Sequence, residues 1–198
     1  GEGAVITGAG VAGYETSDTA ATLILTDGRR FDGDVILAAD GIHSAIRKQM
    51  VPGEGDPIWN GAIMWRGTTQ ARHFLGGNAM ALAGHDSQRF VAYPISAEDP
   101  ETGLAEINWI AELRVDPSRA LSKGDWNRPA DKAHFAPAFD GWVFDWLDCP
   151  AMIAASGVVY EYPMVDREPL PSWTDGCVTL IGDAAHATYP VGSNGASL

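Results

Sequence analysis

This chain of 198 residues contains only two cysteines, and their scarcity limits the chemistry that cysteine can supply. Cys149 and Cys177 stand far apart, and neither has a partner at the short spacing of zinc or redox sites. We therefore expect no disulfide framework and no metal centre. Cys177 begins an apolar strand and is interpreted as a buried free thiol, which favours a reducing, cytoplasmic setting.

Positive charge is also scarce, because 13 Lys and Arg residues face 26 Asp and Glu residues for a net charge of −13. A protein of this sign repels the nucleic-acid backbone and anionic lipid surfaces, so neither class of partner is expected. No apolar run approaches the roughly 18 residues that a membrane helix needs. There is also no charged and then apolar leader at the start of the chain.

What the sequence does contain is typical of a globular protein. Hydrophobic residues make up 45% and charged residues 20% of the chain. The length suffices for one large domain or two small ones. Because the chain begins Gly-Glu-Gly without a methionine, we expect an internal fragment of a longer protein.

The segment Gly8-Ala9-Gly10-Val11-Ala12-Gly13 matches the G-x-G-x-x-G pattern of dinucleotide-binding proteins, with Asp32 and Asp34 about twenty residues later. That motif requires a helix to begin at the glycines. The residues that follow instead indicate a strand, a hairpin turn at Asp27-Gly28 and a second strand. The favoured interpretation is a strand loosened or bulged by its glycines, and nicotinamide binding by Gly8–Gly13 remains the alternative.

Residues 35–50 carry a second motif. The apolar run 35–39 predicts a strand that is covered on both faces. Asp40-Gly41 follows it, and Ser44 can cap a helix that continues through Met50 with Arg47 one turn in. Without other support, this pattern describes only a capped helix with an arginine on its surface.

The third motif lies at the end of the sequence. The apolar, β-branched run 177–181 ends in Gly182-Asp183, and Pro190 and Gly192 then indicate the start of a helix. A carboxylate at the tip of a buried strand can accept hydrogen bonds from ligand hydroxyls. Glycines at a helix start let backbone N–H groups approach an electron-rich group.

Taken together, the Asp40-Gly41 and Gly182-Asp183 motifs resemble those of the single-component FAD-dependent aromatic hydroxylases, and most closely the phenazine and salicylate type. In that family NAD(P)H reduces FAD, dioxygen adds to give a C4a-hydroperoxide, and its distal oxygen is transferred to an aromatic ring. The resemblance implies that the first motif lies near the FAD pyrophosphate and assists NAD(P)H binding, and that Asp183 binds the ribityl chain. It assigns cofactor binding to Asp40, Gly41, Ser44, Arg47, Arg167, Gly182, Asp183, Pro190, Gly192, Ser193, Asn194 and Gly195.

The middle of the chain has a different character. After the Pro- and Gly-containing segment 52–57, residues 61–69, 80–83, 89–93 and 104–114 read as strands joined by turns. Alternation in the last of these places Asn108 on a mainly polar face and predicts an antiparallel sheet whose other face is buried. Six of the seven tryptophans lie between Trp59 and Trp146, which suits either core packing or a wall for a flat aromatic ligand.

Positions in the resembled fold suggest further site residues. Pro190 and Tyr189 are candidates for the catalytic face, and Arg66 and Tyr93 are candidates for substrate contacts. Arg167 lies in a segment that the family places near the flavin edge, although a solvated arginine in a proline-rich connector is equally compatible with the sequence. The sequence does not identify the group that deprotonates a substrate phenol.

The sequence thus predicts an α/β (α+β) protein with a partial FAD-binding, Rossmann-like domain (1–55 and 161–198) and an inserted antiparallel-sheet substrate domain (56–160). FAD is the expected cofactor, NAD(P)H the reductant, and dioxygen and a small aromatic or heteroaromatic molecule, carboxylated or phenolic, the substrates. A homodimer is possible. Two alternatives remain, namely a nicotinamide-binding module at Gly8–Gly13 and a flavoprotein oxidase or reductase that does not hydroxylate.

Overall fold

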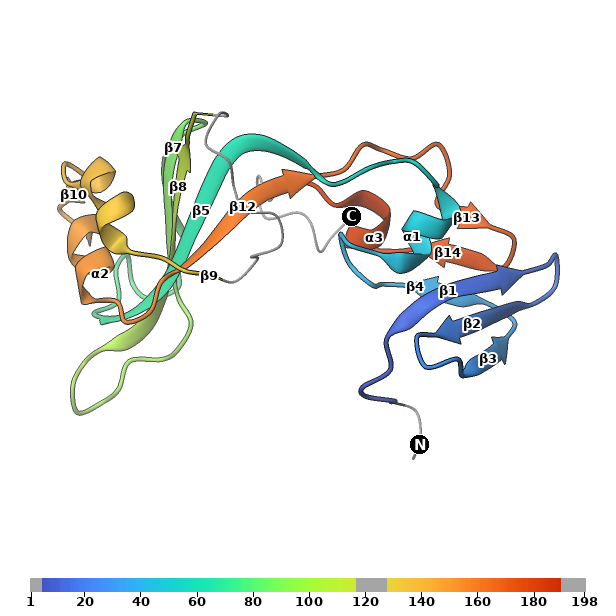
Figure 1. The fold of residues 1–198 in the computed structure, drawn as a ribbon. Helices are drawn as coiled ribbons and strands as arrows, with labels where there is room; N and C mark the ends of the chain where they lie inside the picture. The colour runs from blue at the N-terminus through green and yellow to red at the C-terminus, as the bar shows by residue number, and fades with distance from the viewer. Residues whose placement is uncertain (1–4, 117–127, 190–198) are drawn as a thin grey trace. The chain divides into compact units, whose positions relative to one another are not determined.

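The computed structural model describes residues 5–116 and 128–189, and for Asn60 it describes only the backbone. These residues form two compact units (Figure 1). Unit 1 comprises residues 1–58 and 165–198, and unit 2 comprises residues 59–164. The fold is mixed α/β and mostly strands, so the expected α/β (α+β) class is confirmed, and it contains a parallel strand pair and a separate antiparallel sheet. The assignment of the units to FAD and substrate remains a prediction.

Unit 1 begins with an antiparallel meander of β1 (Val11–Thr16), β2 (Ala21–Leu25) and β3 (Arg30–Gly33). The pairing of β1 with β2 shifts register between Val11 and Gly13, so the expected glycine-linked bulge is confirmed. The G-x-G-x-x-G segment therefore leads into a strand and not into a helix. Without a helix start, these glycines lack the aligned N–H groups that hold a pyrophosphate.

The second sheet of unit 1 has the order β13-β14-β4. β4 (Ile36–Ala38) runs parallel to β14 (Val178–Leu180), and β13 (Thr174–Asp175) pairs antiparallel with β14. Helix α1 (Ala45–Met50) and the single turn α3 (Asp183–His186) follow the two parallel strands. The sequence had not indicated α3, because a run of small residues carries no apolar period.

The core of unit 1 is small and depends on close contacts between residues of modest size. Ala38, Val178 and Leu180 of the parallel pair are at most 5% exposed, and they pack with Ile46 of α1. The opposite face of β4 differs from expectation, since Val35 is 60% and Leu37 is 63% exposed. The prediction that this strand is covered on both faces is therefore wrong for the part of the chain that the structure describes.

Unit 2 is built on a sheet of order β6-β7-β8-β5-β12-β9. Its strands are β5 (Ile58–Ala71), β6 (Ala81–His85), β7 (Gln88–Pro94), β8 (Ala105–Arg114), β9 (Arg128–Pro129) and β12 (Tyr160–Asp166). The expected strands over 61–69, 80–83, 89–93 and 104–114 are all present. β5 continues two residues beyond its expected end and pairs with β8 through Ala71.

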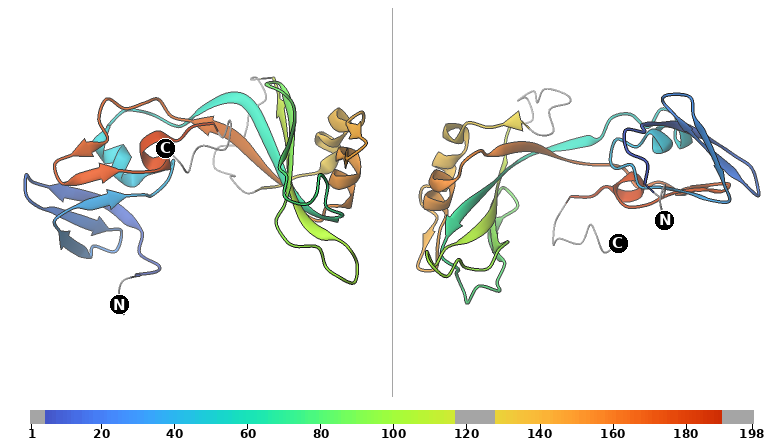
Figure 2. Two further views of the ribbon diagram at one scale, coloured as in Figure 1. Left: turned by 180° about the vertical axis from the view of Figure 1, so that it is seen from behind. Right: turned by 90° about the horizontal axis from the view of Figure 1, so that it is seen from below.

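The remaining elements of unit 2 gather on one side of this sheet (Figure 2). They are the 3-10 turns η1 (Lys132–His134) and η2 (Ala136–Phe139), the hairpin β10 (Val143–Phe144) and β11 (Leu147–Asp148), and helix α2 (Cys149–Ala155). Asp148 caps α2 by accepting from the Ala151 N–H at 2.9 Å. These elements cover the sheet face on which the apolar residues of β8 lie.

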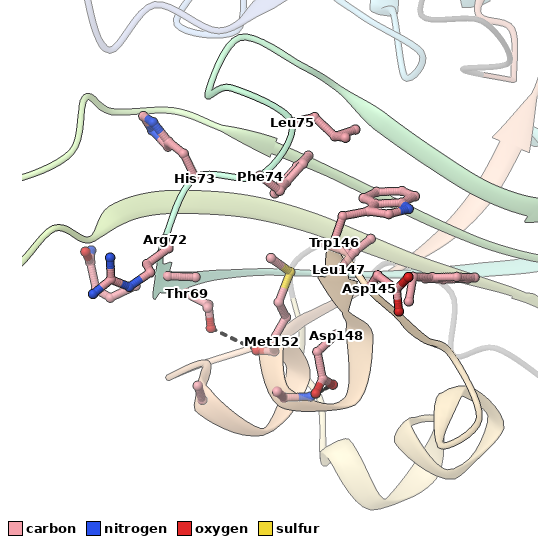
Figure 3. A pocket seen from close by; sticks show the side chains of 15 residues that line it. Thr69, Arg72, His73, Phe74, Leu75, Asp145, Trp146, Leu147, Asp148 and Met152 are labelled. Atoms are coloured by element: carbon pink, nitrogen blue, oxygen red, sulfur yellow. Dashed lines mark hydrogen bonds between the residues drawn. The ribbon is translucent and has the colours of Figure 1, made fainter.

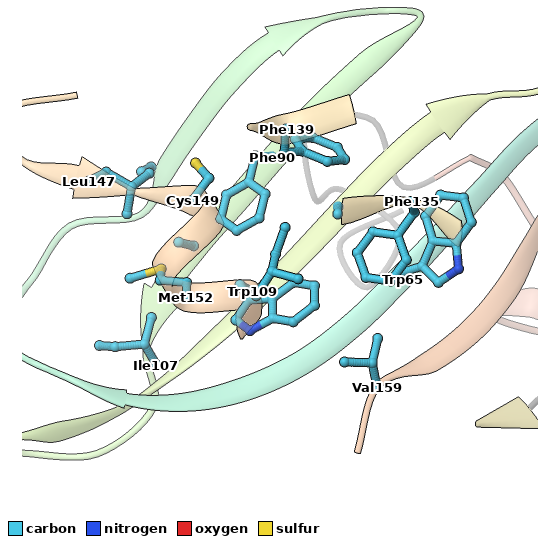
Figure 4. Packing of buried hydrophobic residues seen from close by; sticks show 14 of the residues in the cluster. Trp65, Phe90, Ile107, Trp109, Phe135, Phe139, Leu147, Cys149, Met152 and Val159 are labelled. Carbon is cyan, nitrogen blue, oxygen red and sulfur yellow. The ribbon is translucent and has the colours of Figure 1, made fainter. Parts of the chain in front are cut away.

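Aromatic rings fill the space between the sheet and these elements (Figure 4). Trp65 stacks on Phe135 with ring centroids 4.7 Å apart, and Trp109 stacks on Phe90 at 5.8 Å. The indole N–H of Trp109 donates to Ser156 Oγ at 2.7 Å, so the buried donor has a partner. Of the alternatives for the tryptophans, core packing holds for Trp65 and Trp109, which are both at most 1% exposed.

Candidate functional site

The parallel pairing of β4 with β14 brings two carboxylates to one edge of the sheet. Leu180 lies opposite Ala38, and the Ile181 N–H donates to the Ala38 carbonyl at 2.9 Å. Because both strands point the same way, Asp40 and Asp183 follow neighbouring carboxyl ends although 143 positions separate them in the sequence. In α/β sheets, ligands bind just outside this edge.

Asp40 and Ser44 shape the start of α1. The Asp40 carboxylate accepts from the Ala45 N–H at 2.9 Å, and Ser44 Oγ accepts from the Arg47 N–H at 2.8 Å, so the expected cap is confirmed. Gly41 has φ +78°, a conformation that residues with a side chain rarely adopt. One oxygen of Asp40 therefore serves the helix start, and the exposed carboxylate retains further lone pairs for a ligand.

Gly182 and Asp183 form the corresponding turn after β14. Gly182 has φ +56°, and nothing lies within 4 Å of the position that a Cβ would occupy there, so a side chain is disfavoured by backbone strain and not by crowding. Asp183 is exposed, and its carboxylate makes no hydrogen bond or ion pair to any residue in the described ranges. A free carboxylate of this kind has the acceptor chemistry that the sugar-like hydroxyls of a ribityl chain require.

Arg47 is buried, in contrast to the surface position that a capped helix alone suggested. Its side chain is 1% exposed, and its Nη1 donates to the carbonyls of Ala184 at 3.0 Å and Ala185 at 2.7 Å. Its Nη2 donates to the Glu168 carbonyl at 2.9 Å. These bonds tie α1 directly to α3, and hence the Asp40 turn to the Asp183 turn.

Glu54 neutralises this buried guanidinium, a role that its position in a glycine-rich boundary did not indicate. Its Oε2 accepts from Arg47 Nε at 2.9 Å and from Arg167 Nη1 at 3.0 Å. The hydrogen bond from Arg47 is the main reason that the pKa of the Glu54 carboxyl is lowered, and Arg167 adds to the effect. Glu54 is thus a carboxylate that links two of the predicted cofactor-binding arginines.

Arg167 is also held by protein atoms. Its Nε donates to the Ile42 carbonyl at 2.8 Å, next to the Asp40-Gly41 turn, and its side chain is 10% exposed. The solvated connector arginine that the sequence left open is therefore not what the structure contains. Arg167, Ser44 and Glu54 also line a cavity of about 410 Å³ whose wall includes His43 and Lys48.

The substrate candidates Arg66 and Tyr93 lie on one face of the unit 2 sheet. Arg66 Nε donates to Asn108 Oδ1 at 2.7 Å, and Tyr93 lies directly opposite Asn108 in the pairing of β7 with β8. The structure therefore brings both candidates together around Asn108. Sequence reasoning missed Asn108 as a site residue because alternation marked it only as a residue of the polar face.

A separate cavity of about 590 Å³ opens at the end of the same sheet (Figure 3). Phe74, Trp146 and Met152 contribute apolar wall, and Arg72 lies at its side. Leu75, at the rim, is the one residue other than glycine with positive φ in the described ranges. None of the predicted site residues within the described ranges lines this cavity.

Several predicted residues cannot be placed. Pro190, Gly192, Ser193, Asn194 and Gly195 lie outside the described residues, and so does the helix start expected there. Tyr189 is described and is half-buried. Among the residues that the structure covers, no group of three or more His, Cys, Asp or Glu side chains could hold a metal ion. No described helix is both long and apolar enough to cross a bilayer.

Comparison with known proteins gives relatives but no family model, since none matches the chain. The chain is 41% identical over 168 residues to the phenazine 1,6-dicarboxylic acid hydroxylase PhzS of Lysobacter antibioticus, which covers 84% of this chain and 41% of that protein. It is 28% identical to 3-hydroxybenzoate 6-hydroxylase 1 of Aquipseudomonas alcaligenes over 98% of this chain and 46% of that protein. The chain thus spans a little under half the length of these relatives.

Solved structures show the same fold. HpxO of Klebsiella pneumoniae, complexed with FAD and uric acid, superposes with a TM-score of 0.71 at 24% identity, over 95% of this chain and 46% of that one. A substrate complex of salicylate hydroxylase gives a TM-score of 0.69 at 23% identity, over 92% of this chain and 47% of that one. The fold expected from the sequence is therefore confirmed.

Proposed function

Since the homologues of this chain are FAD-dependent aromatic hydroxylases, as the sequence motifs indicated, we propose that it forms part of an enzyme that hydroxylates an aromatic or heteroaromatic ring. NAD(P)H would be the reductant and dioxygen the oxidant. The observation that carries the proposal is the placement of Asp40 and Asp183 at neighbouring carboxyl ends of parallel strands. Two acidic turns at one sheet edge suit a ligand that presents many hydroxyls.

FAD fits the residues that are present. Asp183 offers an exposed carboxylate without a protein partner in the described ranges, beside a glycine whose conformation disfavours a side chain. Asp40 and Gly41 form the neighbouring turn. When bound, FAD would supply the redox chemistry by accepting a hydride from NAD(P)H and activating dioxygen. In our proposal Asp183 binds the ribityl hydroxyls, and Asp40, Gly41 and Ser44 lie toward the pyrophosphate.

The two arginines have a different part in this proposal than the family resemblance implied. The N–H groups of Arg47 are directed at Glu54 and at backbone carbonyls of α3 and residue 168, so Arg47 positions the Asp183 turn and does not itself hold a phosphate. Arg167 fixes the backbone next to Gly41 through its bond to Ile42. Both therefore act on the cofactor through the turns that they hold.

The remaining assignments rest on the resemblance. We propose that Pro190 and Tyr189 border the substrate, and that Gly192, Ser193, Asn194 and Gly195 supply N–H groups to the flavin ring. Arg66 and Tyr93 would contact the substrate. The name of the relative from Lysobacter antibioticus makes phenazine carboxylates the first substrates to test. A homodimer and a cytoplasmic location are part of the proposal, and two free thiols suit such a location.

A flavin titration tests the proposal. FAD fluorescence quenching would be measured on this chain and on the protein encoded by the full reading frame, each as wild type and as Asp183→Asn. Asp34→Asn is the matched control, because Asp34 is exposed in the same unit and makes no hydrogen bond or ion pair within the described residues. We expect FAD binding that Asp183→Asn weakens about tenfold or more, as for loss of a charged hydrogen-bond acceptor, and that the control leaves unchanged. Equal effects of the two variants would refute the assigned role of Asp183.

Product analysis separates the alternatives. With NAD(P)H, dioxygen and phenazine-1,6-dicarboxylate, hydroxylated product supports the hydroxylase, whereas NAD(P)H oxidation without such product on a panel of phenolic and heteroaromatic acids supports an oxidase or reductase. A nicotinamide module at Gly8–Gly13 predicts NAD binding that Gly10→Val abolishes. The bulged strand at this segment argues against that module.

A further inference from the structure

One buried polar atom in unit 2 has no partner. Asn108 is 1% exposed, and its Nδ2 is the single buried side-chain nitrogen or oxygen without a hydrogen bond among the residues that the structure describes. Buried amide groups are almost always hydrogen-bonded, so an exception calls for a physical reason. Buried polar groups without a protein partner are found at ligand-binding sites, among other places.

The orientation of this amide is fixed by its neighbour. Arg66 Nε can only donate a hydrogen bond, and the Asn108 side-chain atom 2.7 Å away must therefore be the oxygen. Exchanging oxygen and nitrogen would set two donors against each other. Nδ2 is accordingly a donor that lacks an acceptor, and the missing acceptor is not a consequence of the way the amide was assigned.

Asn108 lies on the sheet face opposite the aromatic core. Its neighbours along β8, Ile107 and Trp109, point into that core, whereas Asn108 faces the other way with Thr68 and Tyr93 as its cross-strand partners. Within the described residues of unit 2, the helices lie on the core side of the sheet (Figures 1 and 2). The orphan donor therefore belongs to the face left open by those helices.

A cation stands beside this donor. The Arg66 side chain is exposed, and its terminal nitrogens make no hydrogen bond or ion pair with the described residues. A guanidinium and an amide N–H next to each other match the two oxygens of a carboxylate. Arg66 is joined to Asn108 by one bond, so a change of rotamer in this long, exposed side chain can open the way to Nδ2.

We propose that Asn108 is a specificity-determining residue whose Nδ2 donates to a ring carboxylate of the substrate, with Arg66 pairing the negative charge. This inference rests on the proposed function and names the substrate class, a carboxylated aromatic ring. It accounts for a polar residue at a buried position where leucine, of similar shape, would leave no donor unsatisfied. A site built to donate a hydrogen bond rejects analogues that lack the acceptor.

Nuclear magnetic resonance on the 198-residue chain tests this without flavin or turnover. The probes are 3-hydroxybenzoate and 3-methylphenol, which differ in carrying a carboxylate or a methyl group on the same ring. The Asn108 side-chain amide signal is identified by its absence in Asn108→Leu. We expect 3-hydroxybenzoate to shift this signal at millimolar concentration, and 3-methylphenol to leave it in place.

The variants then separate a ligand role from a structural one. Asn108→Leu should weaken 3-hydroxybenzoate binding about tenfold to a hundredfold and leave the unfolding midpoint unchanged or raised, because the lost bond to Arg66 is replaced by water. Asn108→Asp should weaken binding further through charge repulsion, and Arg66→Met should weaken it as well. Arg114→Met, another exposed arginine of the same sheet, is the control for loss of positive charge and should leave binding unchanged.

The results that overturn the inference differ from those that overturn the proposed function. Absent binding of 3-hydroxybenzoate by the wild-type chain refutes the role of Asn108. A lowered unfolding midpoint with unchanged binding in Asn108→Leu does so too, since Nδ2 then serves the fold. If the protein encoded by the full reading frame does not bind FAD, the flavin proposal is refuted, and carboxylate binding by unit 2 is unaffected.

Discussion

Replacing Arg47 by methionine should destabilise the Asp40 and Asp183 turns while unit 2 keeps its stability. The guanidinium is 1% exposed and bonds to Glu54 and to three backbone carbonyls. Removing one partner of a buried ion pair costs about 3–5 kcal/mol where the other charge is left uncompensated. Glu54 keeps its bond to Arg167, which lowers this cost, whereas the carbonyls of Ala184, Ala185 and Glu168 lose their donor, which raises it, so we expect Arg47→Met to fall within that range.

Hydrogen exchange measured on peptides is the suitable assay, because two units need not unfold together. A loss of 3–5 kcal/mol corresponds to an increase in exchange of between about one hundredfold and a few thousandfold in peptides covering residues 36–50 and 178–186. Peptides of β8 provide the internal control and should keep their protection.

A matched variant shows what the same change does at the surface. Arg30 pairs with Glu15 while both side chains are about half exposed, with 48% and 62% of their surface accessible. Because water screens an exposed pair, Arg30→Met should leave the exchange of these peptides almost unchanged. If Arg47→Met exchanges no faster than Arg30→Met, or if β8 loses protection to the same degree, the buried guanidinium does not hold the two turns together.

Three further predictions concern pH, backbone space and thiol reactivity. The pKa of the Glu54 carboxyl is lowered in the folded state. Its charge therefore stabilises the protein at pH values above the unfolded pKa of about 4.5, and this stabilisation is lost as pH falls through the lower folded pKa. Urea titrations at a series of pH values should show a smaller loss of stability in acid for Glu54→Gln than for the wild type. Gly84→Ala should lower the thermal midpoint by several degrees, because the new Cβ would lie 2.1 Å from a backbone carbonyl at φ +108°, whereas Gly141→Ala, with open space, should not. Burial raises the pKa of the Cys149 thiol to about 12, so iodoacetamide should modify Cys177 first at pH 8, and equal rates would contradict the buried position.

Local patterns in the sequence predicted the elements well where period and turn chemistry act within a few residues. The alternation along 105–114 identified the buried face of β8, and the absence of helix signals after Gly13 identified a bulged strand. Ser44 was correctly predicted as a helix cap, because a cap is defined by bonds to residues two and three positions on.

Long-range partners could not be predicted in this way. Nothing in the sequence near Arg47 indicates that its charge is buried, since the carbonyls that it contacts lie 121, 137 and 138 residues away. Glu54 appeared only as part of a turn. Asn108 was assigned to a polar face because alternation shows to which side of the sheet a side chain points. It does not show whether that side chain finds hydrogen-bond partners. The exposed face of Val35 and Leu37 was missed since an apolar run does not reveal which of its faces has a partner.

The separation between β4 and β14 also sets an order for folding during synthesis. About 140 residues lie between these parallel strands, and ribosomes add roughly 5–20 residues per second, so β4 waits on the order of ten seconds for its neighbour. Most strand pairs of unit 2 are formed by segments closer in sequence than this pair. Unit 2 can therefore be complete while β4 still has an unpaired edge, and the two acidic turns come together only after β14 has left the ribosome.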